Sequence, residues 1–191
     1  MGEQFDIRVD ANSAWTAADA DAQMEICARR GVRVIEQPFP VGTCVEEAVR
    51  MAGKGFAIMA DEGVLTSADV RDLATTGSAQ ILNLRLSKNG GMSRVLALAV
   101  EAESHGLSYQ LGCMVGETGI LSCLGRLTAS LLPKPLYIEG SYDEILLEEN
   151  IAVPSFGFGS GGKAPIVRGA GMGYQIEKVR LEKFSRARLT V

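Results

Sequence analysis

The chain has 191 residues, 47% of them hydrophobic and 22% charged, which is typical of a soluble globular protein. Its net charge of −4 gives no reason to expect binding to nucleic acid, and no apolar run approaches the ~20 residues that span a bilayer. Four cysteines without a Cys-x-x-Cys pair and a single histidine indicate neither a disulfide framework nor a zinc site, so we expect a protein of the reducing cytoplasm.

Strand and helix patterns alternate along most of the chain, which is typical of an α/β protein with a parallel sheet. Short apolar runs predict six strands, at residues 5–9, 32–35, 56–60, 81–86, 107–111 and 136–139. Helices are predicted at residues 16–30, 45–51, from an N-cap at Thr66 to just before Gly77, 93–104 and 120–131. The predicted inner face of the first helix consists of Ala18, Ala22, Ile26 and Cys27.

The remaining segments lack a clear period. Residues 87–91, with two glycines, are predicted to form a loop. Residues 156–173 are rich in glycine and are predicted to form a loop or extended tail, followed by a short terminal strand at 186–191. The change of composition after Asn150 predicts one domain over residues 1–150 and a tail over residues 151–191.

Three acidic residues stand where predicted strands end. Asp10, Glu36 and Asp61 are 26 and 25 residues apart, about the length that one strand, one helix and two short loops require. The carboxyl ends of parallel strands meet at one edge of a sheet, so the three carboxylates are expected to converge there. A site built from oxygen ligands alone suits Mg²⁺.

Five segments carry a resemblance to a known family: VDANSAW, IEQPF, ADEGV, NLRLSKNGG and LGCMVGETGI, in this order along the chain. Residues 5–180 resemble the catalytic barrel of the enolase superfamily, in the branch of mandelate racemase and muconate lactonizing enzyme. The resemblance implies a partial TIM-type (β/α) barrel in which Asp10, Glu36 and Asp61 hold Mg²⁺. It also implies that a base removes the proton α to a small-molecule carboxylate, with a racemase or epimerase, cycloisomerase or dehydratase outcome.

The residue expected to act as the base departs from the family pattern. Relatives carry a lysine in an Asn-x-Lys strand, where this chain has Asn83-Leu84-Arg85. Arginine, with a pKa above ~12, suits charge stabilisation better than proton abstraction. Lys88 is the alternative base if its loop turns it inward, although strand alternation places it on the face opposite Asn83 and Arg85. An exposed lysine before a glycine turn is the plainer interpretation.

Four further polar residues are candidates for binding substrate or orienting a ligand. Asn12 is either a turn residue or a residue that orients a ligand, and Glu62 is either such a residue or a helix N-cap. Glu117 lies in a glycine-bearing turn that leads into a helix, so it has the same two interpretations. Glu139 stands at the end of the last predicted strand.

The resemblance also implies parts that these residues do not include. The family has an N-terminal capping domain and two further barrel strands before the strand that begins here at Phe5. Six strands leave two sheet edges exposed, so we expect a partner, either the N-terminal portion of the same protein or a second copy in a homo-oligomer. The tail would then pack on the barrel or on the capping domain. The alternative is a catalytically inactive barrel that serves as a structural or assembly subunit.

Overall fold

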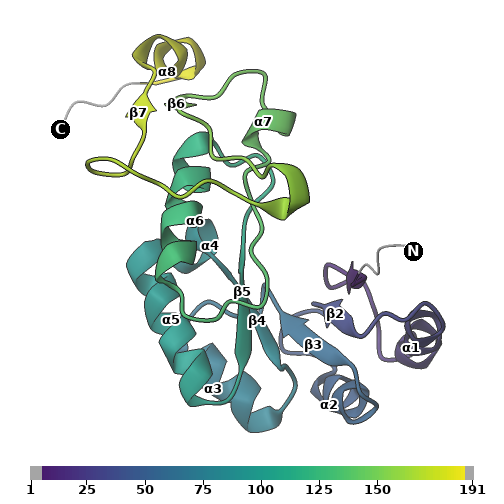
Figure 1. The fold of residues 1–191 in the computed structure, drawn as a ribbon. Helices are drawn as coiled ribbons and strands as arrows, with labels where there is room; N and C mark the ends of the chain where they lie inside the picture. The colour runs from purple at the N-terminus through teal and green to yellow at the C-terminus, as the bar shows by residue number, and fades with distance from the viewer. Residues whose placement is uncertain (1–5, 188–191) are drawn as a thin grey trace. The chain divides into compact units, whose positions relative to one another are not determined.

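The computed structural model describes residues 6–187 of the chain (Figure 1). Five strands form one sheet in the order β1-β2-β3-β4-β5, so each strand lies beside the one that precedes it in the sequence. The strands are β1 (Arg8–Asp10), β2 (Val34–Glu36), β3 (Ala57–Ala60), β4 (Ile81–Arg85) and β5 (Ser108–Gly112). The pairs β1 with β2, β2 with β3 and β3 with β4 are parallel, which confirms the predicted α/β class.

The helices follow the strands in the expected alternation: α1 (Ala20–Arg29), α2 (Val45–Gly53), α3 (Ser67–Thr76), α4 (Leu86–Asn89), α5 (Met92–Ser104), α6 (Gly119–Leu131), α7 (Asp143–Leu146) and α8 (Lys178–Phe184). The chain forms two compact units. The first extends to Leu84 and includes residues 97–110, whereas the second contains residues 85–96 and those from Leu111 onward. The predicted division at residue 150 stays a prediction.

The first helix starts later than predicted and buries a different stripe. Its buried residues follow the spacing i, i+4, i+7: Ala20, Met24 and Cys27. The predicted inner residues Ala18, Ala22 and Ile26 are exposed, so that prediction is wrong apart from Cys27. Both stripes have helical spacing, and packing against the sheet, which spacing alone does not contain, selects one of them.

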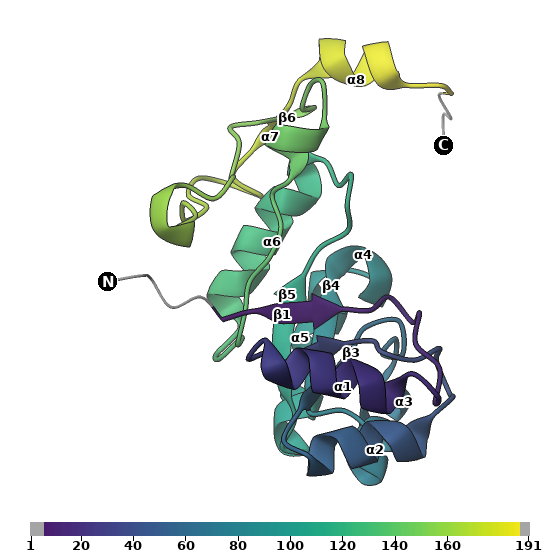
Figure 2. The same ribbon diagram turned by 90° about the vertical axis from the view of Figure 1, so that its right-hand side faces the viewer.

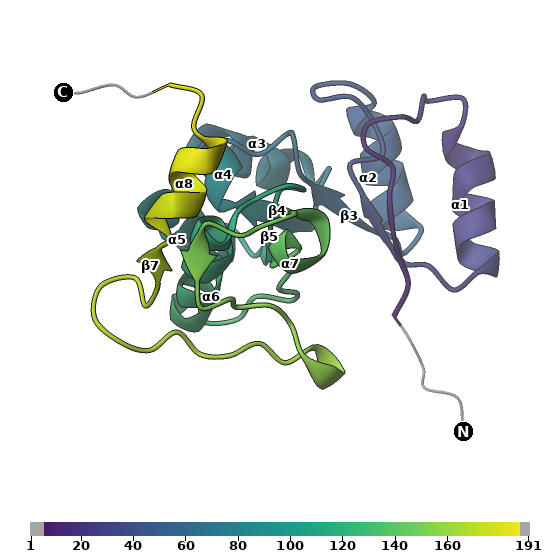
Figure 3. The same ribbon diagram turned by 90° about the horizontal axis from the view of Figure 1, so that it is seen from above.

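One core joins the first two helices to the sheet. Helices α1 and α2 contact each other, and α2 packs against β3 (Figure 3). Ile35 of β2 and Ile58 of β3 are buried in this core, both on the helix-facing side of their strands. The core consists of Ala20, Met24, Cys27, Val32, Ile35, Phe39, Ala48, Met51, Phe56 and Ile58.

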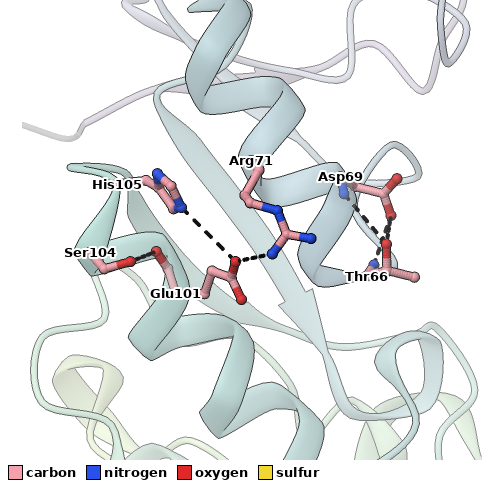
Figure 4. A network of polar contacts seen from close by, with 6 residues as sticks. All are labelled: Thr66, Asp69, Arg71, Glu101, Ser104 and His105. Atoms are coloured by element: carbon pink, nitrogen blue, oxygen red, sulfur yellow. Dashed lines mark hydrogen bonds and ion pairs between the residues drawn. The ribbon is translucent and has the colours of Figure 1, made fainter.

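Helix α3 begins with the predicted N-cap. Thr66 Oγ1 accepts a hydrogen bond from the Asp69 N–H at 3.4 Å, and the Asp69 carboxylate accepts one from the Thr66 N–H at 2.7 Å, which completes a capping box (Figure 4). Farther along, Arg71 Nη1 lies 2.7 Å from Glu101 Oε1 of α5. A hydrogen bond from Ser67 lowers the pKa of Glu101, and the hydrogen bond and charge of Arg71 lower it further. His105 lies near the same carboxylate (Figure 4).

In the second unit, the structure of residues 87–91 and 136–139 differs from the prediction. Residues 86–89 form the short helix α4 in place of the predicted loop start. The predicted sixth strand is reduced to one parallel bridge between Leu111 and Ile138. At this bridge the Leu111 N–H donates to the Tyr137 carbonyl oxygen at 3.0 Å, and the Glu139 N–H donates to the Leu111 carbonyl oxygen at 2.9 Å.

The tail contains more regular structure than predicted (Figure 2). Two short strands, β6 (Ala152–Val153) and β7 (Gln175–Ile176), pair antiparallel, and a single 3₁₀ turn, η1 (Ser160–Gly162), lies between them. Helix α8 follows β7 and ends at Phe184. Most of the predicted strand at 186–191 lies outside the described residues, and Arg186 and Ala187 are not in a strand. Within residues 6–187, no helix has the length and apolar character needed to cross a membrane.

We predict that Thr66→Ala destabilises the chain by about 1 kcal/mol, because the first turn of α3 loses an acceptor for a backbone N–H. Urea unfolding followed by circular dichroism measures the change. The control is Thr75→Ala, an exposed position inside the same helix, where the change is expected to be neutral or slightly stabilising. Equal unfolding midpoints for Thr66→Ala and the unsubstituted chain would contradict the capping role.

Candidate active site

The three acidic residues lie at the carboxyl ends of β1, β2 and β3. Asp10 pairs in register with Glu36, and Glu36 pairs with Met59. Asp61 follows Met59 by two residues. In-register neighbours on parallel strands point to the same face of a sheet, and so do residues two apart on one strand. The register therefore places Asp10 and Glu36 on the face opposite the α1–α2 core, and Asp61 is the first residue after β3.

The acids differ in burial. Asp10 is exposed, whereas Glu36 is 8% and Asp61 2% exposed. Within the described part of the chain, no group of three Asp, Glu, His or Cys side chains is gathered closely enough to hold a metal ion. The convergence of Asp10, Glu36 and Asp61 on a single ion therefore stays a prediction.

Asn83 is a site residue that the sequence analysis missed. It lies on β4, is 1% exposed, and its Nδ2 donates to Glu36 Oε1 at 2.6 Å. A buried carboxylate needs such a donor, because its desolvation is otherwise uncompensated. Asn83 belongs to the segment that resembles the family, and its spacing of two from Arg85 was the available signal.

The face of the sheet that carries Asp10 also carries other polar side chains. Arg8 Nη1 of β1 donates to Gln110 Oε1 of β5 at 2.6 Å, although these strands stand at opposite ends of the strand order. The sheet of this unit must therefore curve to bring them together. Gln110 is completely buried, and Arg8 is two residues from Asp10 on the same strand.

Asn12 and Glu62 now have clearer positions. The Asn12 N–H donates to Asp10 Oδ1 at 2.9 Å, and Asn12 has φ of 45°, so it forms a turn that orients the Asp10 side chain. Glu62 is exposed. The N-cap of α3 is Thr66, so the N-cap alternative for Glu62 is wrong.

In the second unit, Arg85 is the last residue of β4. Its N–H donates to Asn89 Oδ1 at 2.9 Å, and its Nη1 lies 2.9 Å from Met114 Sδ. Helix α4 begins at Leu86, so the strand alternation that placed Lys88 on the opposite face does not extend to it, and that argument is wrong. Lys88 is half-buried on α4.

Glu117 organises the loop before α6. One of its oxygens, Oε1, accepts from the Met114 N–H at 2.8 Å and from Ser87 Oγ at 3.1 Å. Burial raises the pKa of the nearby Cys113 thiol to about 12, and the carboxylates of Glu117 and Glu139 add to the rise. This thiol is therefore neutral at physiological pH.

Arg126 is a second residue that the sequence analysis missed. It lies on α6, is 6% exposed, and its Nη2 donates to the carbonyl oxygen of Glu139. Its guanidinium carbon lies 4.2 Å from the centre of the Phe158 ring. Burial lowers the pKa of Arg126, and the nearby carboxylate of Asp143 acts in the opposite direction. A lone arginine in an apolar helix was the only sequence signal.

Comparison with known protein families matches residues 1–179 to the family described as "Enolase C-terminal domain-like". The chain belongs to this family. The resemblance and the TIM-type barrel fold predicted from the sequence are thereby confirmed. The muconate lactonizing enzyme of Klebsiella pneumoniae superposes on 94% of the chain with a TM-score of 0.83 and 29% identity, and the match covers 50% of that structure.

Curated relatives within the family include two kinds of isomerase. Muconate cycloisomerase 1 of Pseudomonas putida is 30% identical over 97% of this chain and 49% of its own length. The L-Ala-D/L-Glu epimerase of Escherichia coli is 34% identical over 65% of this chain and 36% of its own length. The chain thus spans half or less of the length of these relatives.

We predict that Cys113 reacts with iodoacetamide at pH 8 ~1,000-fold more slowly in the native chain than in urea, because a pKa of about 12 replaces one near 9.0. Peptide mass spectrometry measures the rate at this cysteine. The thiolate fraction, and hence the rate, rises with pH until the folded-state pKa is reached.

Glu117→Gln is expected to speed the reaction, because it removes a negative charge that disfavours the thiolate. Glu62→Gln removes an exposed carboxylate of the other unit and serves as the control. Identical rates for Cys113 in both variants would show that Glu117 does not act on the thiol.

Proposed function

We propose that this chain is the metal-binding part of an enzyme that removes the proton α to a substrate carboxylate and stabilises the resulting enolate. The observation that supports the proposal is the register of β1 and β2, which puts Asp10 beside Glu36, together with the position of Asp61 directly after the neighbouring strand β3. Carboxylate oxygens at this edge fit a hard divalent cation such as Mg²⁺. Asp10, Glu36 and Asp61 would hold it, with Asn83 orienting Glu36.

The bound cation would supply fixed positive charge against the second negative charge of the enolate. Arginine suits charge stabilisation better than proton abstraction, so the role we propose for Arg85 is to stabilise negative charge on the substrate. Lys88 is the proposed base. Glu117, held by Met114 and Ser87, and Glu139 are proposed to bind the substrate or position the groups that do.

The proposed substrate is a small-molecule carboxylate. Relatives named as epimerases, racemases and cycloisomerases favour an isomerase outcome. A racemase, an epimerase and a cycloisomerase can share the same first step, removal of an α-proton, and a dehydratase outcome begins in the same way. The proposal is therefore of this reaction type rather than of a named compound.

A second candidate is a barrel without activity that serves as a structural or assembly subunit. Arg85 favours this candidate, because the family branch that the sequence resembles has its lysine base at this position. The two candidates differ in metal binding, because a subunit with a purely structural role has no need of three aligned carboxylates.

We predict that the chain binds one Mn²⁺ or Mg²⁺ ion and that Asp61→Asn weakens binding about tenfold or more, since it removes a charged ligand. Isothermal titration and the electron paramagnetic resonance of Mn²⁺ measure the dissociation constant. Asp72→Asn, an exposed carboxylate on α3, is the matched control. Binding that appears only when the N-terminal portion of the same protein is supplied in trans would still support the enzyme. Equal affinity in Asp61→Asn would favour the structural alternative.

We also propose that the chain associates, either with the N-terminal portion of the same protein or with a second copy. β1 stands at one end of the strand order, and Ile7 beside it is 54% exposed. An edge strand with unpaired backbone groups recruits partners. Covering a few hundred Å² of apolar surface at ~25 cal/mol per Å² contributes several kcal/mol.

Sedimentation equilibrium at micromolar concentration tests this association. We expect a mass above the 20.3 kDa of one chain. Ile7→Lys, which places a charge beside the edge strand, should shift the distribution toward the monomer. A well-folded 20.3 kDa monomer at all concentrations would contradict the proposal.

A further inference from the structure

Gln37 has a backbone conformation that residues other than glycine rarely adopt. It follows Glu36 directly, its φ is +33°, and it is 8% exposed. Such a conformation persists only where the surrounding contacts over-determine it, and it is found most often at functional sites. The contacts of Gln37 are therefore informative.

The side-chain amide of Gln37 bonds to two loops. Its Oε1 accepts hydrogen bonds from the Asp61 N–H at 2.9 Å and from the Gly63 N–H at 3.3 Å. Its Nε2 donates to the Phe39 carbonyl oxygen at 2.8 Å. The amide thus connects the loop after β2 with the loop after β3, at the residue that supplies the third acid.

The main chain of Gln37 adds two further links. Its N–H donates to the Met59 carbonyl at 2.8 Å, and its carbonyl accepts from the Ser13 N–H at 2.7 Å. Ser13 lies in the turn after β1, three residues beyond Asp10. One residue therefore bonds to the segments that follow β1, β2 and β3, and each of these strands ends at, or directly before, one of the three acids.

We propose that Gln37 is the positioning residue of the metal centre, acting through the backbone of Asp61. The inference rests on the proposed function, because it assigns Asp61 as a ligand. The amide of Gln37 suits this role, since its oxygen accepts from the Asp61 and Gly63 N–H groups while its nitrogen donates to the Phe39 carbonyl; the acceptor is the part that positions Asp61. Outer partners of this kind change metal affinity by roughly 10- to 100-fold when removed.

The alternative role for Gln37 is to fill space between the two loops. Gln37→Met separates the two roles, because methionine has nearly the same length but neither hydrogen bond. Gln37→Glu keeps the acceptor and loses the donor. Gln23→Met is the matched control, since Gln23 belongs to helix α1 and not to the loops that follow β2 and β3.

The first measurement is amide hydrogen exchange by NMR on the full chain. In Gln37→Met we expect the Asp61 and Gly63 amides to exchange about tenfold faster, while amides in α2 keep their protection. Gln37→Glu is expected to restore slow exchange at both amides. Unchanged protection of Asp61 and Gly63 in Gln37→Met overturns the proposal, as does loss of protection throughout the chain in Gln37→Met with no recovery in Gln37→Glu.

The second measurement is the Mn²⁺ dissociation constant of the folded variants. Gln37→Met should bind about tenfold more weakly than the unsubstituted chain, and Gln23→Met equally well. Unaltered Mn²⁺ affinity in Gln37→Met, where the unsubstituted chain binds the ion, contradicts the positioning role. If the unsubstituted chain binds no Mn²⁺, either alone or with the N-terminal portion of the same protein supplied in trans, the proposed function fails. The exchange rates of Asp61 and Gly63 then still decide whether Gln37 positions that loop.

Discussion

The register of the first three strands is the constraint on which the candidate site depends. On one face of these strands Ile35 and Ile58 pack against α1 and α2, and on the other face stand Asp10 and Glu36. A slip of one residue would exchange the two faces and bury carboxylates in the apolar core, at a cost of several kcal/mol for each ion. The hydrophobic packing of α1 and α2 thus determines where the acidic residues lie.

The buried residues Glu36 and Asp61 need hydrogen-bond partners, and neighbouring residues of the fold supply them. Asn83 donates to Glu36, and Gln37 holds the backbone of Asp61. Both amides are themselves almost completely buried, so their orientation is determined by packing. The proposed metal centre would be built on backbone that these hydrogen bonds hold in place, and its carboxylate side chains would have to move together to share a cation.

The second unit shows the same balance between burial and charge with different residues. Burial keeps the Cys113 thiol neutral, and Glu117 is fixed by a backbone N–H and a serine hydroxyl. Arg126 is buried against Phe158 and holds the carbonyl of Glu139. These contacts hold the loops that follow β5 and the Leu111–Ile138 bridge.

The sequence by itself determined the alternation of strands and helices, the N-cap of α3 at Thr66, and the positions of Asp10, Glu36 and Asp61 at strand ends, because these depend on local period and on local hydrogen bonds. Only the tertiary structure decided which stripe of α1 is buried, that α4 turns Lys88 out of the strand alternation, and that residues 136–139 make one bridge. The partners of Glu36 and Asp61 were likewise beyond the sequence. Such contacts join residues far apart in the chain, and spacing along the chain carries no information about which side chains packing brings together.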